Sequence, residues 1–192
     1  MRADGVRNRR RVLDAAMAAF ATDGLSIPVA EVARRAGVGT GTVSRHFPTK
    51  ESLYEAIVST RVAEIVGRAE ELAATHPPGE AFYAFLRYMV DQAAENRGLA
   101  EALAGAGFDI EAAAASGGHD LAGTEAGLLA RAQEAGAVRP DVTTPDVKAL
   151  IVGCLAREQT GPDAIARNRM VQIVSAGLLR EAVRDPVEDV VL

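Results

Sequence analysis

Apolar residues recur at helical spacing along almost the whole chain, and no alternating strand pattern persists for more than a few residues. The sequence therefore predicts an all-α protein. Composition favours the same fold class, because aromatic residues make up only 4% of the 192 residues and tryptophan is absent. A core with so few rings is aliphatic and alanine-rich, which suits packed helices better than β-sheets. The length allows one medium domain or two small ones.

Glycine and proline divide the chain into segments. We expect Gly24 and Gly37 to end the first two helices, because the residue after a helix often needs a positive φ. Thr49 is expected to cap the fourth helix. The alanine- and glycine-rich stretch 105–118 favours no one conformation. The expected helices cover residues 9–23, 28–36, 40–47, 50–74, 80–96, 98–106, 120–136, 144–157 and 162–184.

Charge is divided unevenly along the chain, whose formal net charge is −5. Residues 1–61 carry ten basic and six acidic side chains, a net charge of +4. Residues 62–192 carry eleven basic and twenty acidic side chains, a net charge of −9. A basic end on an acidic protein indicates nucleic-acid contact through that end, but a solvated basic tail gives the same pattern.

The segment Pro28–Phe47 has the most informative pattern: a helix of about two turns, a glycine turn and a second short helix. Such a pair resembles a helix-turn-helix, in which the second helix enters the DNA major groove. Hydroxyls bond base edges or phosphates, and arginine binds guanine or phosphate. The groove face of the second helix is therefore expected to include Thr40, Thr42, Ser44 and Arg45. A small shared core is expected from Val29, Val32, Ala33, Val38 and Val43.

Several short motifs carry a resemblance to a known family. They are Leu13-Asp-Ala-Ala, Phe20-x3-Gly24, Val32-Ala-x2-Ala36-Gly37-Val38, Gly41-Thr42-Val43, His46-Phe47 and Lys50-Glu51-x-Leu53. Together they make residues 10–53 similar to the DNA-binding domain of the TetR family of bacterial transcriptional regulators. A second motif, Leu129-x-Arg131-Ala-Gln-x2-Gly136-x2-Arg139-x-Asp141, resembles a C-terminal domain found in part of that family.

The resemblance implies an N-terminal three-helix helix-turn-helix domain over residues 1–52 and a C-terminal helical effector-binding and dimerisation domain over residues 53–192. Such a protein is a cytoplasmic homodimer that binds a palindromic operator in double-stranded DNA, usually as a repressor, and is released by a small-molecule effector. No enzyme activity, cofactor, metal or membrane partner is expected. The alternative is a ligand-sequestering or protein-interaction module that no longer reads DNA. Ser44 favours this alternative, because the family usually has tyrosine there; Ile27, where a Thr or Ser cap is usual, is a second departure.

Carried over by position, the resemblance implies a set of DNA contacts. His46 has a second interpretation as a helix-end cap, and the N-terminal arginines as a basic start without a DNA role. The expected DNA-binding residues are Arg9, Arg10, Thr40, Gly41, Thr42, Ser44, Arg45, His46 and Lys50.

Two further residue sets are expected in the C-terminal half. An effector pocket is expected from Phe82, Phe85, Leu86, Met89, Leu103, Phe108, Leu128 and Cys154, although stripes at helical spacing are more often plain core. The single cysteine excludes a disulfide within the chain and is expected to be a buried, inert thiol. A dimer interface is expected from Val147, Leu150, Ile151, Val171, Val174 and Leu178, unless these side chains pack within one subunit.

Overall fold

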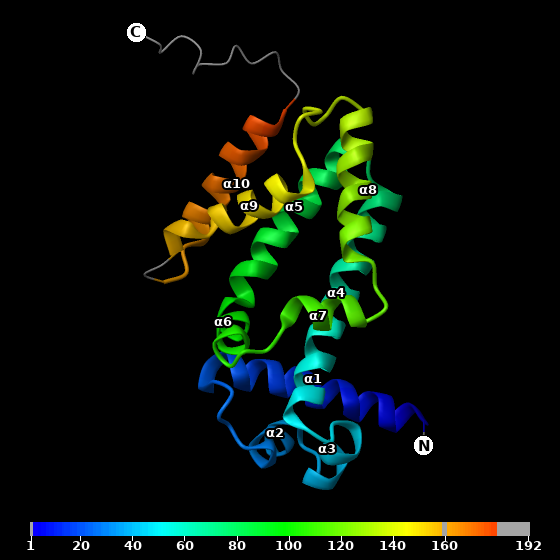
Figure 1. The fold of residues 1–192 in the computed structure, drawn as a ribbon, viewed down its shortest axis with the longest axis vertical. Coiled ribbons are helices and arrows are strands. Elements are labelled where there is room, and N and C mark those ends of the chain that lie inside the picture. The colour runs from blue at the N-terminus through cyan, green and yellow to red at the C-terminus, as the bar shows by residue number, and fades with distance from the viewer. Residues whose placement is uncertain (1, 159–160, 180–192) are drawn as a thin grey trace. The chain divides into compact units, whose positions relative to one another are not determined.

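The protein is described by a computed structural model over residues 2–158 and 161–179, and all regular structure in these ranges is helical (Figure 1). The all-α expectation is confirmed. The described residues form two compact units. The first contains the residues up to Gly67 together with Gln92–Leu121, and the second contains Arg68–Asp91 and the residues from Ala122 onward. All three boundaries between the units fall within helices: α4 (Lys50–Thr75), α5 (Pro78–Glu95) and α8 (Leu121–Glu134). The expected domain boundary after residue 52 stays a prediction.

The first unit is built around α1 (Arg2–Asp23), which contacts α2 (Val29–Ala36), α3 (Thr40–His46) and α6 (Arg97–Gly105) (Figure 1). The helix α7 (Ile110–Ser116) follows α6 and packs against it. The core of this unit is aliphatic apart from a few rings that touch edge to face. Its fully buried side chains include Val12, Phe20, Val32, Val43, Leu53, Ile57 and Leu103.

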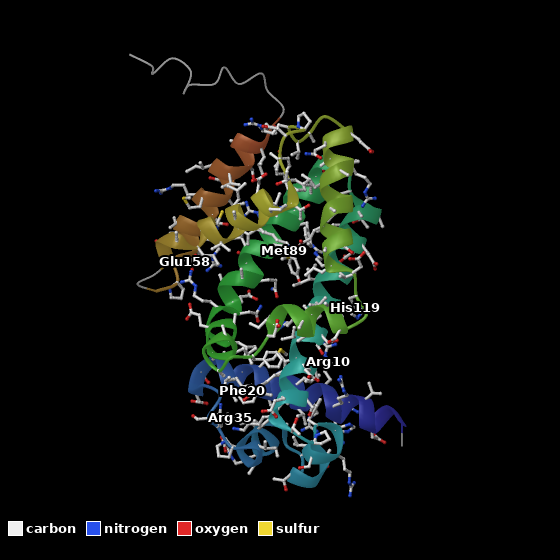
Figure 2. All side chains as sticks on the ribbon, in the orientation of Figure 1. Arg10, Phe20, Arg35, Met89, His119 and Glu158 are labelled. Atoms are coloured by element: carbon white, nitrogen blue, oxygen red, sulfur yellow. The ribbon has the colours of Figure 1, made fainter. Side chains whose placement is uncertain are left out.

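The second unit combines the remaining parts of α4 and α5 with α8 (Leu121–Glu134), α9 (Thr144–Cys154), a short 3-10 turn η1 (Ala156–Glu158) and α10 (Ala164–Leu178). Glu158, which Figure 2 labels, is only 6% exposed. The Arg167 guanidinium donates two hydrogen bonds to its carboxylate, at 2.7 and 2.9 Å. This pair holds α10 against the turn that follows α9.

Three expected helices differ from the structure, and one further helix was not expected. The first begins at Arg2 rather than residue 9, and the stretch 105–118 contains α7, which the Asp109 carboxylate caps by accepting from the Ala112 N–H at 2.9 Å. The helix expected over 144–157 ends at Cys154. The helix expected over 162–184 begins at Ala164, and its residues after 179 lie outside the described ranges. The other helix ends agree within one or two residues.

Candidate DNA-binding surface

The turn between α2 and α3 depends on Gly37. Its φ of 62° and ψ of 40° lie in the left-handed region, which L-residues with a Cβ adopt at a cost. The Gly37 N–H donates to the Arg34 carbonyl at 3.1 Å, and the Val38 N–H donates to the Ala33 carbonyl at 3.0 Å. These bonds satisfy carbonyls that the end of α2 leaves free. A Cβ at position 37 would also lie 2.6 Å from Nη2 of Arg11, so α1 closes over this turn.

The angle between the two short helices is held by a small buried core. Val32 and Ala33 of α2 and Val43 of α3 are at most 1% exposed, and Val29 and Val38 pack against them while half-buried. The shared core expected from the sequence is therefore confirmed. Because one side of α3 is fixed in this way, its opposite side is left for solvent or DNA.

The free side of α3 is small and polar. Thr40, Gly41, Ser44, Arg45 and His46 are exposed, while Thr42 is half-buried. The hydroxyls and the guanidinium are able to hydrogen-bond to base edges and phosphates. Gly41 has no side chain, so DNA is able to approach the helix backbone closely at this position. Gly39 precedes α3 and supplies no side-chain cap. That these residues touch DNA stays a prediction.

Two arginines of α1 have distinct surroundings. The Arg9 guanidinium carbon lies 5.4 Å from the centroid of the Phe47 ring, a cation–π distance that places Arg9 beside the end of α3. Arg10, labelled in Figure 2, forms an ion pair with Glu64 at 3.3 Å. Both side chains are exposed on a regular helix, so the basic start belongs to α1 over Arg2–Asp23.

Lys50 has a structural contact that the sequence did not indicate. Its Nζ donates to the Leu25 carbonyl at 3.0 Å, which ties the first turn of α4 to the segment between α1 and α2. Beside it, the Ser52 N–H donates to Thr49 Oγ1 at 3.0 Å, and the Thr49 N–H donates to Ser52 Oγ at 3.2 Å. The expected Thr49 cap is confirmed. An ammonium retains further protons when it donates one, so the anchor leaves Lys50 able to bind a phosphate.

A charged cluster on α2 was missed by the sequence interpretation. The Glu31 carboxylate accepts hydrogen bonds from Arg34 at 2.6 Å and from Arg35 at 2.8 Å, and Arg35 also pairs with Asp23 at 2.7 Å. The hydrogen bonds from Arg34 and Arg35 lower the pKa of Glu31 to about 2. Spacings of three and four residues on a helix were the available signal. The cluster fixes Arg35, labelled in Figure 2, and lowers the net positive charge of α2.

The residues expected in the effector pocket lie in both units. Phe82, Phe85 and Leu86 line a concavity of the second unit, whereas Leu103 is a core residue of the first unit. Phe108 packs edge to face on Tyr54 in that first core, with 5.7 Å between ring centroids. The other three expected pocket residues belong to the second unit, where Leu128 and Cys154 are buried and Met89 is half-buried.

The residues expected at the dimer interface also divide by burial. Ile151, Val171 and Leu178 are buried within the protomer, while Val147, Leu150 and Val174 are half-buried. The large apolar side chains that α9 and α10 expose are different ones: Val152 at 70%, Ile165 at 76% and Ile173 at 58%.

None of the described helices is long and apolar enough to cross a membrane.

A helix-turn-helix with an exposed polar second helix, joined to a further helical unit, defines a class of helical DNA-binding proteins. Residues 12–57 match the bacterial regulatory proteins of the tetR family, and residues 77–180 match the SbtR-like transcriptional regulator C-terminal domain. The chain belongs to the TetR family of transcriptional regulators. It is accordingly a regulator and not an enzyme, as its sequence led us to expect.

Solved structures of related regulators agree with this assignment. A TetR transcription regulatory protein from Mycobacterium vanbaalenii is 46% identical, with a TM-score of 0.75 over 93% of this chain and 98% of that chain. A TetR transcriptional regulator from Streptomyces coelicolor is 33% identical, with a TM-score of 0.72 over 89% of this chain and 98% of that chain. A gamma-butyrolactone receptor, at 21% identity, has a TM-score of 0.63 over 92% of this chain and 90% of that chain, which shows a shared fold. No curated protein matches the chain.

Proposed function

We propose that this regulator is a repressor, which binds a palindromic operator as a homodimer and is released by a small-molecule effector. The observation that carries the proposal is the exposed face of α3, where Thr40, Ser44 and Arg45 surround Gly41 and are free of the core that fixes the opposite side. Arg9 stands next to this face through its contact with Phe47. The DNA-binding domain is proposed to cover residues 1–52, and the rest of the chain to bind the effector and dimerise.

The homodimer is proposed to form through α9 and α10. The exposed side chains Val152, Ile165 and Ile173 are the contact centre, joined by the half-buried Val147, Leu150 and Val174. Large apolar side chains that stay in water favour burial against a partner. Because a two-fold dimer presents two identical DNA-binding domains, it matches a palindromic site whose halves lie about one helical turn of DNA apart.

Release of the operator requires an effector that binds one conformation of the dimer better than the other. A ligand with equal affinity for the DNA-bound and DNA-free conformations would change nothing, however tightly it binds. We propose the second unit as the place of binding, because the concavity behind Phe82 and Phe85 lies there.

Selection of DNA from a random pool by the full-length protein tests the proposal. The expected result is an enriched palindrome that two protomers bind. The logarithm of the protein's affinity for this palindrome is expected to fall linearly with the logarithm of the salt concentration. Transcription from a promoter carrying this palindrome is expected to fall when the protein is present. A pool that stays random after repeated rounds would contradict the proposal and favour a ligand-sequestering or protein-interaction module instead.

A further inference from the structure

The second unit contains a concavity between α5, α8 and α9 whose wall is apolar except at one point. Its empty space is ≈ 340 Å³ when the part open to solvent is included, and the space that can hold the centres of water molecules is ≈ 10 Å³. That space is enough for about one water molecule. The side chains of these helices are drawn in Figure 2, where Met89 marks α5. The wall includes Phe82, Phe85, Leu86, Leu129, Ile151 and the acidic Glu125.

Glu125 is an unusual residue for such a wall. Its side chain is 9% exposed, and its Oε2 atom is buried without a hydrogen-bond donor in the part of the chain that the structure describes. Most buried polar groups in proteins have such a donor, and a buried charged oxygen without one is unfavourable. The nearest cation is Lys148 Nζ, 3.6 Å from Oε2, which exceeds hydrogen-bond length.

The charge balance of this pair is incomplete. Burial raises the pKa of the Glu125 carboxyl, while Lys148 opposes the shift only in part. The Lys148 side chain is 57% exposed, so solvent weakens its salt bridge with Glu125. The only cation beside the carboxylate in the described residues therefore forms a salt bridge longer than a hydrogen bond, from a side chain that is itself more than half exposed.

We propose that this concavity binds an organic ammonium compound, whose ammonium group donates to Glu125 Oε2 and whose apolar body lies against the wall. An ammonium supplies the short charged hydrogen bond that the carboxylate lacks. The rings of Phe82 and Phe85 favour the same chemistry, because aromatic faces attract cations. Lys148 swings outward as the ammonium enters, and the side chains of the wall move apart to admit the apolar body. The role of such a compound as effector rests on the proposed function.

Binding of three six-carbon probes to the full-length protein tests the site by calorimetry at pH 8. The probes are n-hexylamine, which is cationic at this pH, 1-hexanol and hexanoate. We expect n-hexylamine to bind about tenfold or more tightly than 1-hexanol, and hexanoate to bind weakest. Glu125→Gln is expected to remove the preference for the amine. Lys148→Met is expected to raise the affinity for the amine, because it deletes the competing ammonium.

Glu134→Gln is the matched control, because Glu134 is an exposed glutamate of the same helix. Equal wild-type affinities for n-hexylamine and 1-hexanol would overturn the proposal, and this comparison needs no variant to fold. Absence of binding by every probe would overturn it too, as would unchanged amine affinity in folded Glu125→Gln. Amine binding through Glu125 without any change in operator affinity would leave the site standing and refute only its effector role. Failure to select any operator refutes the proposed function and leaves the site untouched.

Discussion

Among single residues, Gly37 and Gly41 of the helix-turn-helix are needed for different reasons. Gly37 is needed for the backbone conformation of the turn, and Gly41 for the surface that α3 presents. Gly37 has a φ of 62°, and a Cβ there would lie 2.6 Å from Arg11. Gly41 lies within α3 with nothing within 4 Å of an added Cβ. We predict that Gly37→Ala lowers the free energy of unfolding by about 1–2 kcal/mol, because the left-handed region disfavours alanine.

Gly41→Ala is the control for that change. It is expected to leave stability unchanged or raise it by about 0.5–1 kcal/mol, because alanine favours a helix, while its methyl group reduces DNA affinity at the exposed face. Urea unfolding of both variants measures the first effect, and operator binding measures the second. Equal unfolding free energies for the two variants would contradict the assigned role of Gly37.

Arg45 and Lys50 are both cations expected at DNA, but their surroundings predict different consequences of removal. Arg45 is exposed on α3, so Arg45→Ala is expected to weaken operator binding by about 1–3 kcal/mol with stability unchanged. Lys50 also donates to the Leu25 carbonyl, so Lys50→Ala is expected to lower stability by about 1 kcal/mol as well. Binding titrations over a salt series, with urea unfolding alongside, separate the two. Unchanged operator affinity in both variants would contradict the site.

Glu31 makes the stability of the DNA-binding domain depend on pH. Hydrogen bonds from Arg34 and Arg35 hold its pKa at about 2, below the ordinary value of 4.5. A carboxyl with a lowered folded-state pKa stabilises the protein above 4.5, and this contribution is lost as pH falls from 4.5 toward 2. We predict that Glu31→Gln melts at a lower temperature than the wild type at pH 7, and that the difference shrinks below pH 4.5. Thermal melts across this range measure it; a constant difference would contradict the assignment.

The sequence predicted residues by local pattern, and it missed those whose role depends on distant neighbours. The Lys50 anchor joins residues 25 positions apart, so no spacing rule indicates it. Glu125 is a different case. It lies three and four residues before Leu128 and Leu129, which places it beside the buried side of α8. A carboxylate beside an apolar stripe was a readable signal of the site that we propose for an ammonium compound.

Among whole elements, the helices that glycine and proline delimit were predictable and those that depend on other contacts were not. The bounds of α2 and α3 follow from Gly37 and Pro48, which act locally. The early start of α1 was hidden by Gly5, a poor helix former, whereas the i, i+3 ion pair of Arg7 with Asp4 supports a helix there. The helix α7 was hidden among alanines and glycines, although Asp109 caps it.

The contact between α6 and α1 depends on close approach at Gly98. A Cβ at this position would lie 3.3 Å from the Ala21 carbonyl oxygen, so a larger side chain forces the helices apart. We predict that Gly98→Val lowers the free energy of unfolding by about 1–3 kcal/mol. Gly105→Val is the control from the same helix, because nothing lies within 4 Å of its added Cβ. Urea unfolding of both compares them, and equal stabilities would show that close approach is unimportant here.

For the whole molecule, the formal charge of −5 conceals a basic N-terminal segment, with +4 on residues 1–61 and −9 on residues 62–192. Nothing in the sequence indicates which apolar residues of α9 and α10 a second copy could reach, because periodicity identifies an apolar helix but not the side that its own protomer covers. Val171 and Leu178 face inward and Ile165 and Ile173 remain exposed. Only tertiary packing decides between these two sides.

That division gives a test of the proposed homodimer. Ile173 is 58% exposed, so Ile173→Glu is expected to leave the fold of the protomer intact while it places a charge at the centre of the proposed interface. We predict a dimer for the wild type and a monomer for Ile173→Glu at micromolar concentration, measured by sedimentation equilibrium. Val6→Glu adds the same charge at an apolar residue of α1 that is 72% exposed, and it is expected to stay dimeric. Because two linked DNA-binding domains bind a palindrome far more tightly than one, the Ile173→Glu monomer should also lose about 100-fold or more in operator affinity. A wild-type monomer, or a dimer that survives Ile173→Glu, would move the interface elsewhere on the chain.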